Sequence, residues 1–402
     1  MSVTRSHSIK RFFLFPSIVL AVVLFAEFPV RFAWSFFPHQ VDIEDSSYII
    51  PDPILDHVMQ PGGDSGALDK NGYRNTEPLA TYDVVAIGDS MTEGSETSWP
   101  RELSLQTGMS VYNMGVRGYG TAQYAALAEK ALSFHPKFVV VGLNIGRNIF
   151  NTYDVVYGLD SWKQYRSSGF ENDKPRTGDE LKDISVNFKS WRDYLHEHSK
   201  IYGFLSENTR VLREKLGLAS PFMTGTSDWS NADPDAALLY DKIPSQKTLF
   251  WANTVLRSVD MEDKNIVEGL RLNNILLDEL NKKILEGGST LIVSIIPSKE
   301  LVYEARIEEA GLRNPYFEKL VTGQQSIRKS ILSSCEENNI FCFDMLPYLR
   351  GALDDGEVIY MPSVNMHPTS HGYEIFAKGV AEKLNAENIM KNETPLNKQH
   401  DE

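Results

Sequence analysis

The chain has 402 residues, of which 42% are hydrophobic, and its formal net charge is −14. This length and composition allow one large or two small packed domains. The acidic balance, without any cluster of Lys and Arg, argues against a nucleic-acid-binding surface, which needs positive charge against phosphate. We therefore expect a small or neutral partner and no nucleic acid.

The N-terminal segment differs from the rest of the chain. Arg5, Lys10 and Arg11 precede an apolar run at 12–26, the pattern of an export signal. No small-x-small cleavage site follows the run, and positive charge before it directs the following domain to the outside of the cytoplasm. Residues 1–40 are therefore predicted to be a signal anchor in the membrane. The alternative is a secreted protein whose signal peptide is cleaved.

The next residues, 41–80, are rich in Pro, Asp and Gly and are predicted to be an irregular lead-in. From there to residue 390, apolar strand patterns alternate with helical patterns, which is typical of a doubly wound parallel sheet. The predicted strands are 84–87, 111–114, 138–143, 291–296 and 340–343. The predicted helices include 98–108, 121–131, 270–285 and a last one with Phe376, Val380 and Leu384 on one face. The fold class expected is α/β, a three-layer flavodoxin-like fold with a central parallel sheet.

The stretch 151–265 breaks this rhythm and is predicted to be a helical insertion in the domain at 81–390. Insertions near strand ends often build the binding cleft, although a purely structural lid fits equally well. Residues 391–402 are polar and are predicted to be a disordered tail. Cys335 and Cys342 pair if the compartment is oxidising and remain core thiols if it is reducing.

The first predicted strand runs directly into Gly88, Asp89 and Ser90. A hydroxyl at the carboxyl end of a buried parallel strand is a candidate nucleophile, so Ser90 is the first residue to consider for chemistry. The motif differs from the Gly-x-Ser-x-Gly elbow of the α/β-hydrolases. Taken alone, Gly-Asp-Ser often marks only a turn.

Three later loops supply residues that a serine nucleophile needs. The glycine-rich loop at 113–123 has backbone N–H groups for an oxyanion, and the loop at 144–148 carries asparagine amides. His367, before the last helix, is a candidate general base. Each loop follows a strand or opens the last helix, where open parallel sheets bind ligands.

Together these blocks resemble the SGNH/GDSL hydrolases, over 83–384 apart from the insertion. The resemblance implies that Ser90 is the nucleophile and His367 the general base. It also implies an oxyanion hole made by the N–H groups of Ser90 and Gly118 and the amide of Asn148. No cofactor is expected, and no metal, because neither cysteine has a histidine or second thiol at ligand spacing.

Two positions depart from the family pattern. The family has an aspartate two or three residues before the histidine, where this chain has Asn365 and Val364. Asparagine cannot supply the negative charge that stabilises an imidazolium. The nearby carboxylates that can substitute are Asp344, Asp354, Asp355 and Glu357.

The second departure is in the third block, where the sequence is Gly146-Arg147-Asn148. If Asn148 is misassigned there, Asn144 or Arg147 is the donor. The second histidine of the last block, His371, is interpreted as a helix-start residue.

The function that follows is a serine ester hydrolase acting on O-acyl esters, O-acetyl esters foremost, of a small molecule or glycan. Similarity of 68–75 and 296–303 to extracytoplasmic relatives, the alginate O-acetylation proteins among them, suggests that Lys299 and Tyr303 face the substrate. A solvated lysine and a packing tyrosine are the plainer interpretation. An O-acetyltransferase acting on a polysaccharide, or a catalytically degenerate member that binds a glycan or a partner protein, are the alternatives.

Overall fold

A computed structural model describes residues 49–63, 67–76, 78–95, 97–170, 236–239, 248–360 and 366–393. The chain divides into two compact units, and all of these residues belong to the unit comprising 46–175 and 230–402. The predicted anchor at 1–40, most of the predicted insertion, residue Asn365 and the end of the tail lie outside the described residues. No helix among the described residues has both the length and the apolar character to cross a membrane.

The centre of the unit is a five-stranded parallel sheet, and all five predicted strands are present. The strands are β3 (Val84–Gly88), β4 (Val111–Gly115), β5 (Phe138–Asn144), β8 (Thr290–Ile296) and β9 (Phe341–Asp344). They lie in the order β4-β3-β5-β8-β9, the 2-1-3-4-5 order of flavodoxin-like folds. Every residue of β3, β5 and β8 is buried, as expected for parallel strands covered on both faces. The predicted fold class is confirmed.

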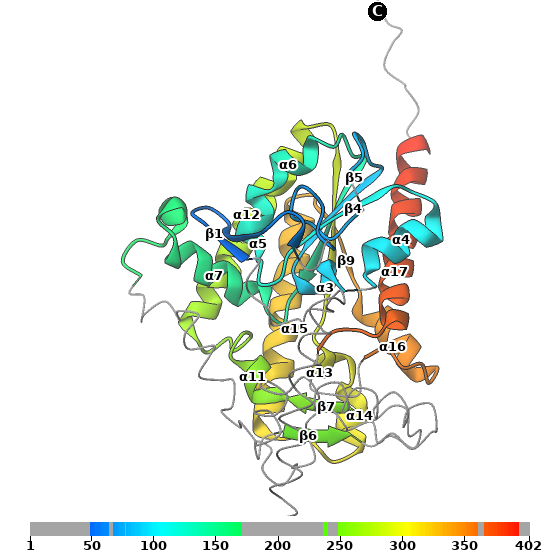
Figure 1. The fold of residues 1–402 in the computed structure, drawn as a ribbon. Coiled ribbons are helices and arrows are strands. Elements are labelled where there is room, and N and C mark those ends of the chain that lie inside the picture. Colours follow the sequence, from blue (N-terminus) through cyan, green and yellow to red (C-terminus); the bar gives the residue numbers. More distant parts are fainter. Residues whose placement is uncertain are drawn as a thin grey trace, which may run out of the picture. The chain divides into compact units, whose positions relative to one another are not determined.

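Helices cover the sheet on both sides (Figure 1). On one side α12 (Lys264–Glu286) packs against α5 (Thr121–Ala126), α6 (Ala128–Leu132) and α7 (Asn148–Gly158). On the other side α4 (Trp99–Thr107) packs against α17 (Ser370–Glu393), which also contacts α16 (Leu346–Asp354). The other helices of the described residues are α3 (Ser90–Glu93), η2 (Asp160–Tyr165), α11 (Ala252–Leu256), α13 (Lys299–Val302), α14 (Glu304–Glu309) and α15 (Pro315–Glu337).

Local sequence explains where several helices begin and end. Helix α4 follows Ser98, has a proline in its first turn and ends at Gly108, whose φ of +73° is left-handed. The helix predicted over 121–131 is instead two helices, α5 and α6, separated at Leu127, and Gly120 is the N-cap of α5. The last helix reaches Glu393, so it continues past the predicted start of the tail at 391.

The lead-in is not wholly irregular. Its residues form an antiparallel hairpin of β1 (Ile49–Asp52) and β2 (Asp56–Met59). A second hairpin, of β6 (Ala236–Leu239) and β7 (Thr248–Trp251), lies within the range predicted as a helical insertion. The two cysteines form a disulfide, between the end of α15 and β9.

A row of glycines decides how closely a helix approaches the sheet. Gly88 of β3 lies opposite Gly115 of β4 and Gly142 of β5. A Cβ atom on Gly88 would meet the Thr92 Oγ1 atom at 2.0 Å, and one on Gly115 would meet the backbone nitrogen of Glu93 at 2.3 Å. Helix α3 therefore rests directly on the carboxyl edge of three strands. This close contact fixes the position of its first residue, Ser90.

Candidate active site

Ser90 is the first residue of α3, immediately after β3. Asp89 is the N-cap, and its side chain accepts a hydrogen bond from the Met91 N–H at 2.9 Å. The cap stabilises the short helix at the point where the strand ends, so the Ser90 hydroxyl is presented at the carboxyl edge of the sheet. No partner for the Ser90 backbone N–H is recorded among the described residues.

His367 reaches Ser90 from the other end of the chain. Its Nε2 atom lies 2.9 Å from the Ser90 Oγ atom. Burial lowers the pKa of His367 below its ordinary value of 6.5; the negative charge of Glu93 opposes this shift and the positive charge of Arg117 adds to it. Because the imidazole is therefore neutral near pH 7, Nε2 can accept the hydroxyl proton. The structure brings the predicted nucleophile and the predicted base together.

Asp89 links the nucleophile turn to the loop after β5. Its Oδ2 atom accepts hydrogen bonds from the Asn144 amide at 2.9 Å and from the Asn148 amide at 3.0 Å. Burial raises the pKa of Asp89 to about 6, and the hydrogen bonds from Met91, Asn144 and Asn148 act in the opposite direction. The aspartate of Gly-Asp-Ser therefore joins two strand ends.

Asn148, predicted to supply an oxyanion donor, has both of its amide hydrogens in use. One is donated to Asp89, and the other to the Tyr119 carbonyl at 3.0 Å. Its carbonyl oxygen accepts from the Asn144 N–H at 2.7 Å, and the side chain is fully buried. The donor role of Asn148 stays a prediction that requires one of these bonds to break.

The two alternative donors differ from Asn148 in their hydrogen bonding. The Asn144 amide nitrogen donates one hydrogen to Asp89, and within the described parts of the chain no acceptor is recorded for its second hydrogen; the amide oxygen accepts from the Gly146 N–H at 3.1 Å. No hydrogen bond of the Arg147 guanidinium is recorded there either. Burial lowers the pKa of Arg147, whereas Glu300 and Asp89 raise it. Asn144 therefore has one amide hydrogen with no recorded acceptor, whereas both amide hydrogens of Asn148 are donated.

Gly118 lies in the turn after β4, beside α3. The turn is attached to that helix because the Arg117 N–H donates to the Glu93 carboxylate at 3.0 Å, and the Arg117 guanidinium forms a 2.8 Å ion pair with it. Gly118 has φ +80°, a left-handed conformation that favours glycine. Across the described ranges its N–H has no recorded partner. Within the described residues, neither the Ser90 N–H nor the Gly118 N–H thus has a recorded partner, and their role as oxyanion donors stays a prediction.

The position of the missing aspartate, Asn365, lies outside the described residues. Of the substitutes considered, Asp344 forms an ion pair with Arg328 at 2.6 Å. Glu357 lies 2.6 Å from His371, whose pKa is raised by hydrogen bonds to Glu374 and Glu357. His371 is the second residue of α17, as the helix-start interpretation predicts.

Among the described residues, Glu93 is a carboxylate that acts on His367, and sequence reasoning did not select it. Glu93 raises the pKa of His367, although its carboxylate is buried and bound to Arg117 and Arg74. Glu93 stands three residues after Ser90 in the same helical turn, and this spacing was the signal available in the sequence. Asp354 and Asp355 are exposed residues at the end of α16.

Lys299 and Tyr303 lie at the carboxyl end of β8, in and after α13. Both side chains are buried, so the lysine is not solvated as the plainer interpretation expects. Burial lowers the pKa of Lys299 to about 8, and its Nζ atom lies 5.6 Å from the centre of the Phe250 ring. Tyr303 packs against Phe250 and Tyr360. Contact of Lys299 and Tyr303 with a substrate stays a prediction.

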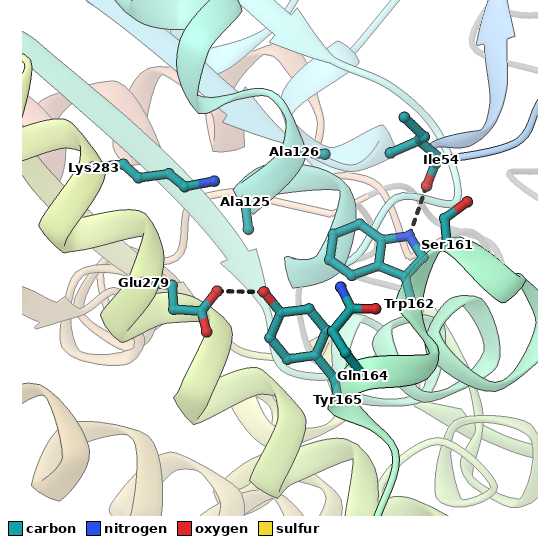
Figure 2. Close-up of a pocket in the computed structure, with 9 residues that line it drawn as sticks. All are labelled: Ile54, Ala125, Ala126, Ser161, Trp162, Gln164, Tyr165, Glu279 and Lys283. Carbon is teal, nitrogen blue, oxygen red and sulfur yellow. Dashed lines mark hydrogen bonds between the residues drawn. The ribbon is translucent and has the colours of Figure 1, made fainter.

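None of the predicted site residues lines the hollow of about 240 Å³ that Figure 2 shows. It is lined by Ile54, Ala125, Ala126, Ser161, Trp162, Gln164, Tyr165, Glu279 and Lys283. The Trp162 Nε1 atom donates to the Ile54 carbonyl at 2.8 Å, which attaches the β1–β2 hairpin to η2. Within the described ranges, no group of three or more His, Cys, Asp or Glu residues is arranged to hold a metal ion.

No family model matches this sequence, and no curated protein is significantly similar to it. Solved structures similar to the chain include one named as a lipolytic protein of the G-D-S-L family from Desulfitobacterium hafniense, at 14% identity over 74% of this chain and 97% of that one, with a TM-score of 0.35. An acetylxylan esterase from Geobacillus stearothermophilus has 12% identity over 75% and 93%, with a TM-score of 0.35. A GDSL-like lipase from Bacteroides thetaiotaomicron has 12% identity over 77% and 93%, with a TM-score of 0.32. The family that the sequence motifs resemble is thus found among these structures.

Proposed function

We propose that this chain is a serine ester hydrolase of the SGNH/GDSL type that works through a covalent acyl-enzyme. The observation that supports this most is the 2.9 Å contact between Ser90 Oγ and His367 Nε2. Since burial keeps the imidazole neutral, it can take the serine proton as the oxygen attacks an ester carbonyl.

The reaction proceeds in two halves. Ser90 attacks the carbonyl carbon, His367 takes its proton, and the oxyanion is stabilised by the N–H groups of Ser90 and Gly118 with a third donor from Asn148 or Asn144. The carbon–oxygen bond to the alcohol then breaks, and the alcohol leaves with the proton from His367. Water, deprotonated by His367, next attacks the carbonyl carbon of the acyl-Ser90 ester. The bond from that carbon to the Ser90 oxygen breaks, His367 returns the proton to Ser90, and the acid leaves.

The proposed substrate is an O-acetyl ester, carried by a glycan or a small molecule. This rests on the resemblance of 68–75 and 296–303 to proteins of polysaccharide O-acetylation. A sugar hydroxyl that replaces water in the second half would make the protein an O-acetyltransferase. The proposed site of action is outside the cytoplasm, with the protein held by its N-terminal segment; the Cys335–Cys342 disulfide supports an oxidising compartment.

Asn365 favours one competing function, a degenerate member that binds a glycan or partner protein without turnover. An asparagine supplies no negative charge to an imidazolium. The two functions differ in whether Ser90 reacts covalently with an acylating reagent.

Labelling of the full chain with a fluorophosphonate probe tests the proposal. We expect the wild type and the control Ser326→Ala, which changes an exposed serine of α15, to be labelled equally. Ser90→Ala is expected to be silent. A folded wild type that does not react would contradict the proposed enzyme and support the binding protein.

A further inference from the structure

The peptide between Arg117 and Gly118 is the middle of a tight turn. The Tyr119 N–H donates to the Val116 carbonyl at 3.2 Å, and Gly118 has φ +80°. Arg117 is not among the described non-glycine residues with positive φ, so the turn is type II rather than type I′. Types I and II differ by a flip of this central peptide, so the hydrogen bond between the turn ends does not fix where the Gly118 N–H points.

A histidine from the lead-in holds the carbonyl of this same peptide. The His57 Nε2 atom lies 2.9 Å from the Arg117 oxygen. Because a carbonyl only accepts, Nε2 carries the hydrogen of this bond. The described peptide bonds are all trans, so the C=O and N–H of one peptide point in opposite directions. A bond on the Arg117 carbonyl therefore directs the Gly118 N–H away from His57.

The other ring nitrogen of His57 also faces an acceptor. Nδ1 lies 2.8 Å from the Asp56 Oδ2 atom. The hydrogen bond from the ring to the Arg117 carbonyl polarises the peptide whose N–H is the proposed oxyanion donor. Asp56 holds the ring at its other nitrogen, so the pair of Asp56 and His57 fixes the orientation of the ring toward the turn.

The hairpin that carries His57 is attached by hydrogen bonds to the turn at 116–119 and to η2. The Tyr119 hydroxyl donates to the His57 carbonyl at 2.6 Å, and the Trp162 indole donates to the Ile54 carbonyl at 2.8 Å (Figure 2). The turn itself is also held by Glu93 of α3, whose carboxylate accepts a hydrogen bond from the Arg117 N–H. A Cβ atom on Gly118 would lie only 3.4 Å from the His57 Cε1 atom, so the ring packs against the turn itself.

We propose that His57 is a positioning residue of the oxyanion hole: its bond to the Arg117 carbonyl locks the type II turn with the Gly118 N–H directed toward the acyl oxygen. The proposal rests on the proposed hydrolase function. It gives the β1–β2 hairpin, which precedes the first strand of the sheet, a part in transition-state stabilisation.

Three variants of the full chain separate this role from simple bracing. His57→Phe keeps an aromatic ring beside Tyr119 but donates no hydrogen bond, whereas His57→Gln keeps an N–H that can reach the carbonyl. His371→Phe makes the same substitution at an exposed histidine and is the matched control. With a small aryl acetate, we expect His57→Phe to lower kcat about tenfold at unchanged KM, because the hydrogen bond to the Arg117 carbonyl is lost. His57→Gln should recover most of the loss, and His371→Phe should keep the wild-type kcat.

A second readout does not depend on turnover. The sequence contains two Arg–Gly pairs, Arg117-Gly118 and Arg350-Gly351. Labelling with carbonyl-13C arginine and 15N glycine therefore gives two selected amide signals. We expect His57→Phe to shift the Gly118 signal and to leave the Gly351 signal in place.

The outcomes are distinct for the two proposals. Wild-type kcat in His57→Phe, an equal loss in His371→Phe, or an unmoved Gly118 signal would each overturn the positioning role while Ser90-dependent labelling stands. If the wild type shows no Ser90-dependent labelling, the hydrolase proposal fails, and the positioning role fails with it.

Discussion

His57 contacts the turn at 116–119 and His367 contacts Ser90; the two histidines come from opposite ends of the chain and have opposite surroundings. Both ring nitrogens of His57 face oxygens that accept, the Asp56 carboxylate and the Arg117 carbonyl. His367 has a hydroxyl at Nε2, and burial lowers its pKa. A ring whose Nε2 atom donates to a backbone carbonyl holds that backbone in place, whereas a neutral ring beside a hydroxyl can accept a proton. The partners of an imidazole, more than its position near a serine, indicate what it does.

Removal of the proposed general base, His367, tests the side of this comparison with the larger expected effect on kcat. We expect His367→Ala to lower kcat for a small aryl acetate by about 10²- to 10⁴-fold, the range over which a positioned base contributes. The check is a steady-state assay beside a thermal unfolding scan, which shows whether the variant is folded. The exposed His371→Ala is the matched control. A folded His367→Ala with wild-type kcat would remove His367 from the mechanism.

Gly118 is the residue on which the His57 side of the comparison acts. Gly118→Ala adds a Cβ atom 3.4 Å from the His57 ring at a residue with φ +80°, so the turn must shift. We expect kcat to fall by about 10²- to 10³-fold, as for loss of an oxyanion donor, with little change in KM. Gly351→Ala is the control, because a Cβ there has no heavy atom within 4 Å. Equal kcat in the two variants would contradict the donor role of Gly118.

Asn365, two residues before His367, gives a further test of the contrast between the two histidines. If Asn365 takes the third place of the triad, Asn365→Asp adds the charge that an imidazolium needs, and we expect hydrolysis of the aryl acetate to rise about tenfold or more. The reverse change costs about 10⁴ in a serine protease triad. Asn365→Ala is the control, and no gain or a loss in Asn365→Asp would reject this alignment.

The smallest expected effect is in the pH profile. His367 must be neutral to act as a base, and its pKa is lowered from 6.5, so the acidic limb of kcat/KM should lie below pH 6.5. An added carboxylate favours the charged ring and raises the pKa, so the limb of Asn365→Asp should lie at higher pH than that of the wild type. Profiles measured with the same aryl acetate check both points. An acidic limb above pH 6.5 in the wild type would contradict the effect of burial.

Much of the fold could be predicted from the sequence because parallel strands covered on both faces need continuous apolar runs. The runs at 84–87 and 138–143 became β3 and β5 with nearly the same bounds. The hairpin in the lead-in was missed, since its two short strands carry Pro, Asp and His and are half exposed. The break between α5 and α6 has no Gly or Pro to mark it in the sequence.

The candidate site divides in the same way. Ser90 and His367 were identified because each stands in a short motif at a strand end or a helix start. The use of both Asn148 hydrogens, and the effect of Glu93 on His367, depend on atoms from segments that the sequence does not connect. The packing of these segments sets the direction in which the Asn148 and Glu93 side chains point, so no local sequence pattern predicts it.

The sequence by itself determined the order of strands along the chain, the serine after the first of them and the histidine before the last helix. These follow from local hydrophobicity and motif spacing, which act over a few residues. Only the tertiary structure decided which N–H donors have no recorded partner. It also decided which histidine bonds a backbone carbonyl and which one lies beside the serine hydroxyl. Those outcomes depend on hydrogen bonds between residues that are 60 apart, as for His57 and Arg117, or 277 apart, as for Ser90 and His367.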